Sequence, residues 1–128
     1  IKRKPIIKIY GNDYKTPDGT AIRDYIHVSD LAEIHYKLLS KINKTNKSVI
    51  VNCGYYKGTS VNDVINEFKR QTNKKFSVLI QKRRAGDLAA VIANNTRLKK
   101  IISWKPKYFK LSTIVKSCIQ WEKKSHTN

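Results

Sequence analysis

Apolar positions along the chain recur with two different periods, which divide it into expected helices and strands. Spacings of three and four residues predict helices that begin near Ser29 and Val61, and a last helix from about Leu111 to Lys123. Short runs rich in β-branched and aromatic residues predict strands at 5–10, 25–28, 48–54, 76–81 and 91–93. Strands that alternate with helices in this way indicate an α/β fold.

Polar residues suited to capping stand at the expected helix starts. Ser29 or Asp30 is expected to open the first helix, with Glu33 completing a capping box. Ser60 is expected to open the second helix in the same way, and an asparagine at 94 or 95 to open a brief helix over 96–101. The apolar stripe of the first helix consists of Leu31, Ile34, Leu38, Leu39 and Ile42. The residues of the last helix that are expected to face inward are Ile114, Val115, Cys118 and Ile119.

A long polar loop separates the first strand from the first helix. Turn-forming residues crowd its front half, from Gly11 to Gly19. A loop of this length within a compact domain commonly has a functional role. Arg23 stands at its end, next to Asp24. On the residues alone, Arg23 is either a surface arginine paired with Asp24 or a guanidinium that binds an anion.

Length and charge narrow the classes of function. At 128 residues the chain is long enough for one core. The net charge of +18 raises the possibility of nucleic-acid binding, yet only six of the 27 basic residues are arginine. The lysines are spread along the whole chain, and aromatic residues are not interleaved with them as in a base-stacking surface. A lysine-rich solvated surface is therefore the preferred interpretation, with nucleic-acid binding as the alternative.

The cysteines, the lack of a long apolar run and the lack of methionine bear on where the protein is located and on whether the chain is a complete protein. Cys53 and Cys118 have no CxxC spacing, so we expect buried free thiols and neither a disulfide nor a metal site. No apolar run approaches the roughly 20 residues that span a bilayer. We therefore expect a soluble cytoplasmic protein. The chain contains no methionine and opens without a cap or signal-like segment, so we expect a piece of a longer protein.

Three blocks of sequence carry a family resemblance and together cover nearly the whole chain. They are GNDYKTPDGTAIRDYIHVSDLAEIH at 11–35, VNCGYYKGTSVNDVI at 51–65 and RRAGDLAAVIAN at 83–94. In this order and spacing they resemble the UDP-glucose 4-epimerase family, of the extended short-chain dehydrogenase/reductase superfamily. The resemblance implies that residues 1–128 form the carboxy-terminal, UDP-sugar-binding part of such an enzyme, with a small mixed sheet and flanking helices.

The resemblance also implies an activity for the full-length protein. Family members interconvert UDP-galactose and UDP-glucose through a 4-keto intermediate, using bound NAD, and a homodimer is expected. Neither G-x-x-G-x-x-G nor Tyr-x-x-x-Lys occurs in this chain. No catalytic, cofactor-binding or metal-binding residue is therefore assigned here; NAD is expected on the absent amino-terminal half, and the chain alone is expected to be inactive. Asp30–Gly54 is expected to pack on that half, so the chain alone should leave apolar surface uncovered.

Substrate contacts follow from the resemblance, residue by residue. Arg23 and Arg84 match the two diphosphate-binding arginines, and Asp87 matches an acceptor for the ribose hydroxyls. The other matched positions are Lys8, Ile9 and Tyr10 along the uracil, Tyr25 within the Arg23 block, Val61 against the nucleotide, and Val91 beside the hexose.

Several of these positions also have a simpler structural interpretation. Arg84 could be a solvated turn charge beside Arg83, Asp87 a turn cap, and Val61 plain helix core. His27 and His35 have no partner at ligand spacing and are interpreted as structural. A related dehydratase or uronate epimerase remains the alternative enzyme.

Overall fold

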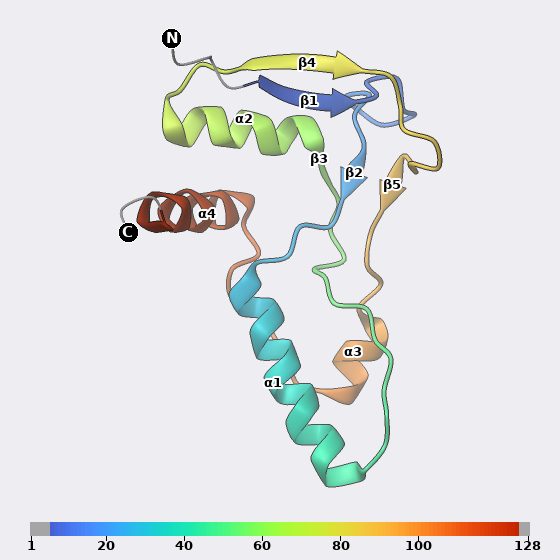
Figure 1. Cartoon of the computed structure of the whole chain (residues 1–128). Coiled ribbons are helices and arrows are strands. Elements are labelled where there is room, and N and C mark those ends of the chain that lie inside the picture. Colours follow the sequence, from blue (N-terminus) through green and yellow to red (C-terminus); the bar gives the residue numbers. More distant parts are fainter. Residues whose placement is uncertain (1–5, 126–128) are drawn as a thin grey trace.

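The structure, a computed structural model, describes residues 6–125. Figure 1 shows an elongated molecule, with a sheet and its covering helices at one end and helices alone at the other. The elements in chain order are β1 (Ile6–Tyr10), β2 (Ile22–Arg23), α1 (Val28–Thr45), β3 (Thr59–Ser60), α2 (Val61–Thr72), β4 (Ser77–Gln81), β5 (Ala90–Val91), α3 (Thr96–Ile101) and α4 (Leu111–Ser125). We call β1, β4, α2 and α4 the sheet lobe, and α1, α3 and the segment 46–55 the helix lobe.

Two small sheets organise the strands. In the sheet lobe β1 runs parallel to β4, from Ile6 opposite Ser77 to Tyr10 opposite Gln81. Between the lobes a three-stranded sheet has the order β3-β2-β5, with β2 antiparallel to β3 and parallel to β5. The helix α2 covers one face of the β1–β4 sheet, and α4 lies on the far side of α2 (Figure 1). The structure thus confirms an α/β fold with small mixed sheets and flanking helices.

The main buried cluster lies in the helix lobe and joins α1 to α3. It consists of Ile34, Leu98, Ile102 and Trp104, with partly buried residues such as Leu38, Val51 and Tyr55 packed against it. Ile34 is fully buried, which confirms the centre of the predicted α1 stripe. Leu39 is 59% exposed, so the stripe is narrower than the sequence predicted.

The start of α1 differs from the prediction. Residues 25–28 form no strand, and the two-residue strand β2 ends at Arg23 instead. His27 is the N-cap, and its Nδ1 accepts a hydrogen bond of 3.0 Å from the Ser29 N–H. Neither Ser29 nor Asp30 caps the helix, because the Asp30 side chain is fully buried and accepts hydrogen bonds from another segment. His27 is therefore structural, as the sequence indicated.

The segment 48–54 forms no strand, although its sequence is typical of one. No strand among residues 6–125 pairs with it, and Ile50 is 82% exposed. A strand requires a hydrogen-bonded neighbour, and this segment has none in the described structure. The predicted strand is therefore wrong for this chain, whatever its environment in a longer protein.

Apart from β3, which the sequence did not predict, the remaining elements agree closely with the sequence. The first strand is confirmed for 6–10, whereas Pro5 lies outside the described residues. Ser60 caps α2, where its Oγ accepts from the Asp63 N–H at 3.0 Å. The predicted strand at 76–81 begins one residue later, α3 has the predicted bounds, and the strand predicted at 91–93 lies at Ala90–Val91.

Two further expectations concern side-chain exposure and membranes. Cys53 is only partly buried and Cys118 is exposed, so the expectation of buried thiols was wrong, although both are free. On α4, Val115 is buried as predicted. Within residues 6–125, every helix is too short or too polar to cross a bilayer.

Candidate functional site

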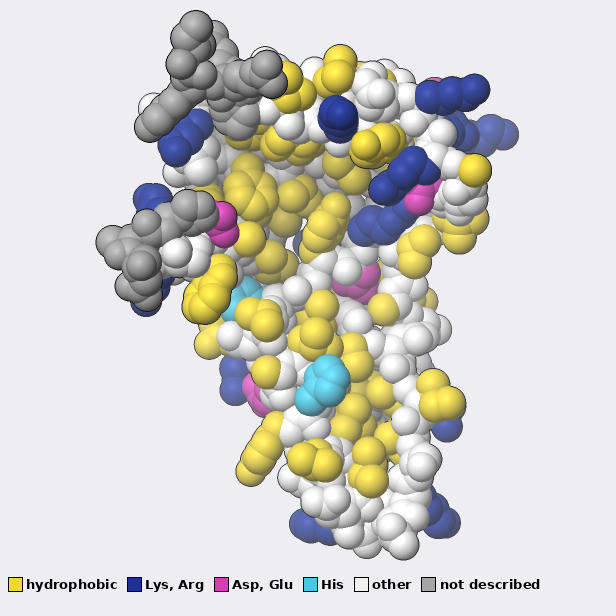
Figure 2. Space-filling model, in the orientation of Figure 1, with side chains coloured by type: hydrophobic (Ala, Val, Ile, Leu, Met, Phe, Trp, Pro, Cys, Tyr) yellow, Lys and Arg dark blue, Asp and Glu magenta, His cyan; other side chains and the backbone are white. Residues whose placement is uncertain are grey.

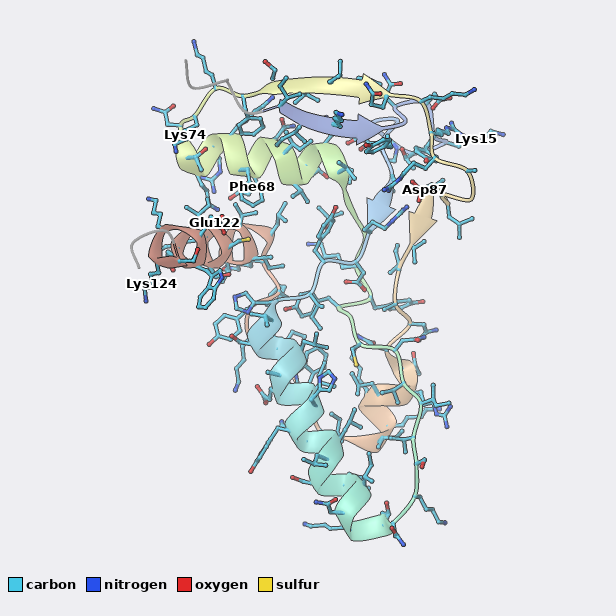
Figure 3. The ribbon with its side chains drawn as sticks, in the orientation of Figure 1. Lys15, Phe68, Lys74, Asp87, Glu122 and Lys124 are labelled. Atoms are coloured by element: carbon cyan, nitrogen blue, oxygen red, sulfur yellow. The ribbon has the colours of Figure 1, made fainter. Side chains whose placement is uncertain are left out.

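Charged side chains converge on Asp87, in the connection between β4 and β5. The Nε of Arg84 donates to one Asp87 carboxylate oxygen at 2.9 Å, and Arg23 Nη2 lies 3.9 Å from the other. Asp87 lies close to the start of β5 and to β2 (Figure 3). In Figure 2 basic side chains surround an acidic one in this region of the surface. Two guanidinium groups from distant parts of the sequence thus share one carboxylate.

Strand pairing and backbone contacts fix the position of Arg23. Its strand β2 lies between β3 and β5, where Arg23 is opposite both Thr59 and Val91. Its Nη1 donates to the carbonyls of Ile22 at 2.8 Å and Leu88 at 3.0 Å. The side chain is 29% exposed, so part of it still faces solvent. The alternative pairing of Arg23 with Asp24 is wrong.

Asp24 instead fixes the backbone around the site. Its carboxylate accepts from the N–H groups of Tyr55 at 3.0 Å, Tyr56 at 2.9 Å and Ala93 at 3.3 Å. These contacts join the end of β2 to the chain before β3 and to the chain after β5. A carboxylate that accepts several backbone N–H groups contributes to stability because hydrogen bonds to a charged group are strong. Asp24 is therefore a structural partner of the site, which the sequence did not reveal.

Tyr10 extends the site along β1. The Arg84 guanidinium carbon lies 4.7 Å from the centroid of the Tyr10 ring, a cation–π geometry. Tyr10 and Lys8 lie on the exposed face of β1, whereas Ile9 is 5% exposed and faces the core. The side chain of Ile9 therefore packs in the core, and only its backbone groups are available to a ligand.

The loop between β1 and β2 is held in shape by another carboxylate. Asp18 accepts from the Thr20 N–H at 2.9 Å and from the Ser60 hydroxyl at 2.5 Å. Burial alone would raise the pKa of Asp18, but the hydrogen bonds from Ser60 and Thr20 hold that pKa below its usual value. A Cβ at Gly19 would lie 2.1 Å from the Asn12 carbonyl oxygen, so only glycine fits there. The loop is thus tied to the start of α2.

The other predicted residues lie around this cluster with different degrees of contact. Val91 is 48% exposed and pairs with Arg23 across β2 and β5. Val61 begins α2, and its N–H donates to the Ala21 carbonyl at 3.0 Å. Tyr25 lines a small hollow of about 20 Å³ with Tyr55 and Phe109. Burial raises the pKa of Tyr25, while the charge of Arg23 opposes that rise. Among all the predicted site residues, direct contacts join Tyr10 to Arg84, Arg84 to Asp87, and Asp87 to Arg23.

Within residues 6–125 the titratable groups form no metal-holding cluster, and the Tyr55 hydroxyl is hydrogen-bonded to a buried carboxylate. No three of the His, Cys, Asp and Glu side chains in residues 6–125 are placed to hold a metal ion. The Tyr55 hydroxyl donates to buried Asp30 at 2.6 Å and accepts from the His27 N–H, so it is already engaged. Burial and the Asp30 carboxylate raise the pKa of Tyr55 far above its ordinary value. The guanidinium groups of Arg23 and Arg84 beside Asp87 are of the kind that can hydrogen-bond an anion.

A larger hollow of about 630 Å³ lies elsewhere, between α2 and α4. Its lining includes Phe68, Lys74, Cys118 and Glu122. Three of these residues are labelled in Figure 3, far from Asp87. Since the convergent charges gather at Asp87, we take that cluster and not the hollow as the candidate site.

Comparison with known proteins supports the family resemblance. Residues 1–54 match the NAD dependent epimerase/dehydratase family. Over 123 residues the chain is 40% identical to the UDP-glucose 4-epimerase of Azospirillum brasilense, an alignment that covers 96% of this chain and 35% of that protein. The chain therefore spans about a third of the length of the curated relatives that it matches.

Solved structures give the same result. The UDP-Glc/GlcNAc 4-epimerase from Campylobacter jejuni has a TM-score of 0.83 at 41% identity, over 96% of this chain and 37% of that one. The UDP-glucose-4-epimerase from Stenotrophomonas maltophila, solved with NAD and formylated UDP-arabinopyranose, has a TM-score of 0.88 at 31% identity, over 96% and 36%. The chain is homologous to part of UDP-glucose 4-epimerase, an NAD-dependent isomerase.

Proposed function

We propose that this chain is the UDP-binding, carboxy-terminal part of a UDP-glucose 4-epimerase. The full-length protein interconverts UDP-galactose and UDP-glucose through a 4-keto intermediate. One observation carries the proposal: Arg23 and Arg84 converge on Asp87 beside Tyr10, in a chain homologous to such epimerases. Planar guanidinium groups are suited to two-point hydrogen bonding of phosphate oxygens.

Each residue of the cluster has a role in this proposal. Arg23 and Arg84 bind the diphosphate, and Asp87 accepts hydrogen bonds from the ribose hydroxyls. Tyr10 offers an aromatic face to the uracil, because it is 38% exposed at the end of β1. The remaining proposed contacts are the backbone of Lys8 and Ile9 with the base, Val61 and Tyr25 with the nucleotide, and Val91 with the hexose.

The residues present do not fit the NAD cofactor. A dinucleotide fold places the cofactor diphosphate at a helix N-terminus directly after a parallel strand. Here β1 leads into the loop of residues 11–21 and β4 into the charged turn of residues 82–89, so neither strand of that parallel pair runs into a helix. The parallel strands β2 and β5 are only two residues long, and four residues without a glycine separate each from the helix that follows. NAD is therefore proposed to bind the part of the full-length protein outside this chain, and no chemical step is assigned to residues of this chain.

Strong contacts with UDP and weak contacts with the hexose suit the proposed reaction. The keto sugar has to turn between two orientations during epimerisation, so a tight grip on either hexose face would slow turnover. Binding energy directed at the nucleotide holds the substrate while leaving the sugar free. The charges at Asp87 can supply that binding energy without touching the reacting carbon.

Asp30–Gly54 is proposed to pack on the cofactor-binding part of the full-length protein. Several large apolar residues in and beside this segment are exposed in this chain, among them Val28, Tyr36, Leu39 and Ile50. Burying them would remove their apolar surface from water.

Alanine substitution of the two arginines tests the diphosphate site. In the full-length protein, Arg23→Ala and Arg84→Ala should each weaken UDP binding about ten- to a hundredfold, because each removes a charge-assisted hydrogen bond. Arg→Lys should restore only part of the affinity, since the planar fork is lost. Isothermal titration with UDP measures both effects, and Lys82→Ala serves as the control for loss of one nearby positive charge. An unchanged Kd in both alanine variants would contradict the proposal.

The isolated chain provides a second test. With added NAD, residues 1–128 alone should convert no UDP-galactose to UDP-glucose, because they contain neither a cofactor site nor an acid/base tyrosine in Tyr-x-x-x-Lys. A coupled assay for UDP-glucose measures this. Turnover by the purified chain would contradict the proposal that the cofactor site and the acid/base tyrosine lie outside this chain.

A further inference from the structure

The turn at 82–87 carries two consecutive arginines whose side chains contact different parts of the molecule. Arg84 contacts Asp87 and Tyr10, as described above. Arg83 instead donates from Nε to the Asp13 carboxylate at 2.6 Å, and from Nη2 to the Asp13 backbone carbonyl. Its guanidinium carbon lies 4.1 Å from the centroid of the Tyr14 ring. Arg83 thus binds the loop after β1, while Arg84 stays at the site.

Close packing beneath Arg83 fixes these contacts. Gly11 has φ +91°, and a Cβ there would lie 2.7 Å from both Arg83 Cγ and Tyr14 Cε2. The Gly11 N–H donates to the Gln81 carbonyl at 2.9 Å, which holds the loop against the end of β4. Tyr14 is 5% exposed. The stem and the head of Arg83 are therefore both held by the loop; we call Asp13, Tyr14 and Arg83 the loop clamp.

Further contacts of the turn lie within the site itself: Arg84 contacts Asp87 and Tyr10, Asp87 contacts Arg23, and the Asp87 N–H donates to the Arg84 carbonyl at 3.3 Å. Gly86 has φ +81° and nothing within 4 Å of the position of a Cβ, so the far side of the turn is open. Arg23 is held independently, by strand pairing and by the carbonyls of Ile22 and Leu88. The distance between the two site arginines therefore depends on how firmly the turn is held.

We infer that Arg83 is a positioning residue for the proposed UDP site. Through Asp13 and Tyr14 it holds the 82–87 turn so that Arg84 and Asp87 face Arg23. This inference rests on the proposed function, because it assigns Arg83 a role in UDP affinity without contact with UDP. Rigid placement of binding groups before the ligand arrives raises affinity by reducing the ordering cost of binding.

Neutralising Asp13 should have opposite effects on UDP binding if Arg83 acts by positioning and if only the overall charge matters. Asp13 is a negative charge beside a proposed anion site, so its neutralisation would tighten UDP binding if charge alone mattered. If Asp13 holds Arg83, Asp13→Asn weakens binding. The expected loss is about threefold, the size that exposed ion pairs contribute.

The experiment is isothermal titration of UDP with the full-length protein that contains this chain. Arg83→Ala should raise Kd about fivefold, and Lys82→Ala, which removes the same charge one residue earlier, should change Kd less than about twofold. Arg83→Lys should give an intermediate Kd, because lysine keeps the charge but not the fork. Failure to fold would lower the binding stoichiometry, whereas lost positioning raises Kd at unchanged stoichiometry.

A double variant tests whether Arg83 acts through Arg84. In the Arg84→Ala background, Arg83→Ala should lose most of its effect on Kd; an independent contact would give the same factor in both backgrounds. If Arg84→Ala weakens UDP binding but Arg83→Ala and Asp13→Asn resemble Lys82→Ala, the positioning role is overturned alone. If Arg84→Ala has no effect, the proposed function fails first.

Discussion

The segments 77–81 and 48–54 have similar sequences and different structures. Both are short, rich in β-branched residues and typical of strands. The first forms β4, because β1 lies beside it and supplies a parallel ladder. The second forms no strand, and Ile50 at its centre is 82% exposed. The pattern of residues describes the environment that a segment requires, and a strand forms only where the partner is present.

The two lobes differ in a similar way, in how many of the partners that their residues require are present in this chain. In the sheet lobe, strand pairing brings the loop of residues 11–21, the 82–87 turn and β2 to one end, where the charged site forms. In the helix lobe, one apolar cluster and one buried carboxylate hold α1 in place while several large apolar side chains face solvent. The predictions below test how far each lobe depends on contacts within this chain.

Loss of the buried carboxylate should have the largest effect on stability. Asp30 accepts from the Tyr55 hydroxyl and from the N–H groups of Lys107 and Tyr108. Asp30→Ala leaves these donors without an acceptor and should lower the free energy of unfolding by about 4 kcal/mol. Urea denaturation of the chain measures this. Asp63→Ala, at an exposed aspartate in the first turn of α2, is the control, and equal losses in the two variants would contradict the prediction.

Two apolar residues of α1 should differ in the same assay. Ile34 is fully buried, so Ile34→Ala should cost about 3 kcal/mol in the isolated chain. Leu39 is exposed, so Leu39→Ala should cost less than about 0.5 kcal/mol there. If the exposed face packs on the rest of a full-length protein, the cost of Leu39→Ala should rise in that protein. An unchanged small cost would show that the face remains in water.

Amide hydrogen exchange compares the two strand-like segments directly. The alternate amides of 77–81 that donate to β1 should be protected both in this chain and in the full-length protein, since β1 is present in both. Amides of 48–54 should exchange rapidly in this chain and about a hundredfold more slowly in the full-length protein, where a neighbouring strand would pair with them. Rapid exchange of 48–54 in both proteins would refute the proposed packing.

Val91 offers a test of specificity at the site. It is 48% exposed beside Arg23, and valine leaves more room there than tyrosine, so we expect the full-length enzyme to accept N-acetylhexosamine nucleotides too. Val91→Tyr should lower kcat/KM for the N-acetylated substrates about tenfold and spare the plain hexoses, because a clash is introduced. Rejection of UDP-N-acetylgalactosamine by the unmodified enzyme would mean that other residues close the pocket.

The smallest expected effect is a pH dependence at the loop of residues 11–21. The pKa of Asp18 lies below its usual value of 3.8 in the folded chain. Its contribution to stability is therefore fully present above pH 3.8 and is lost as the pH falls through the lower folded value. Asp18→Asn should cost about 1 kcal/mol at pH 5 and nothing once the carboxyl is protonated. Urea midpoints from pH 5 downward, for both proteins, measure the difference; parallel curves would contradict it.

Local sequence was sufficient for the elements that depend on local contacts. The capping serine at 60 and the apolar spacing after it predicted α2, and the bounds of α3 were correct. These elements are defined by hydrogen bonds between residues three or four apart, which the sequence places directly. The helix start at α1 was missed because the His27 ring, and not the serine or aspartate beside it, accepts the capping hydrogen bond.

The candidate site likewise combines residues that the sequence predicted with contacts that only the structure revealed. The sequence, through its family resemblance, named Tyr10, Arg23, Arg84 and Asp87, and the structure brings all four into contact. It did not reveal that Asp24 binds backbone N–H groups, that Asp30 is buried, or that Arg83 binds Asp13. The sequence Arg23-Asp24 is the same whether Asp24 pairs with Arg23 or with a distant segment, so the sequence alone does not reveal the partner of Asp24.

The sequence by itself determined the α/β character and the presence of the four helices, with the start of α1 one residue off, and its family resemblance named the charged residues of the candidate site. The tertiary structure decided which partners those charges have, and whether the segment 48–54 is a strand. The physical reason is range: helix caps and apolar periodicity act between near neighbours, whereas strand pairing and the burial of a carboxylate depend on groups tens of residues away.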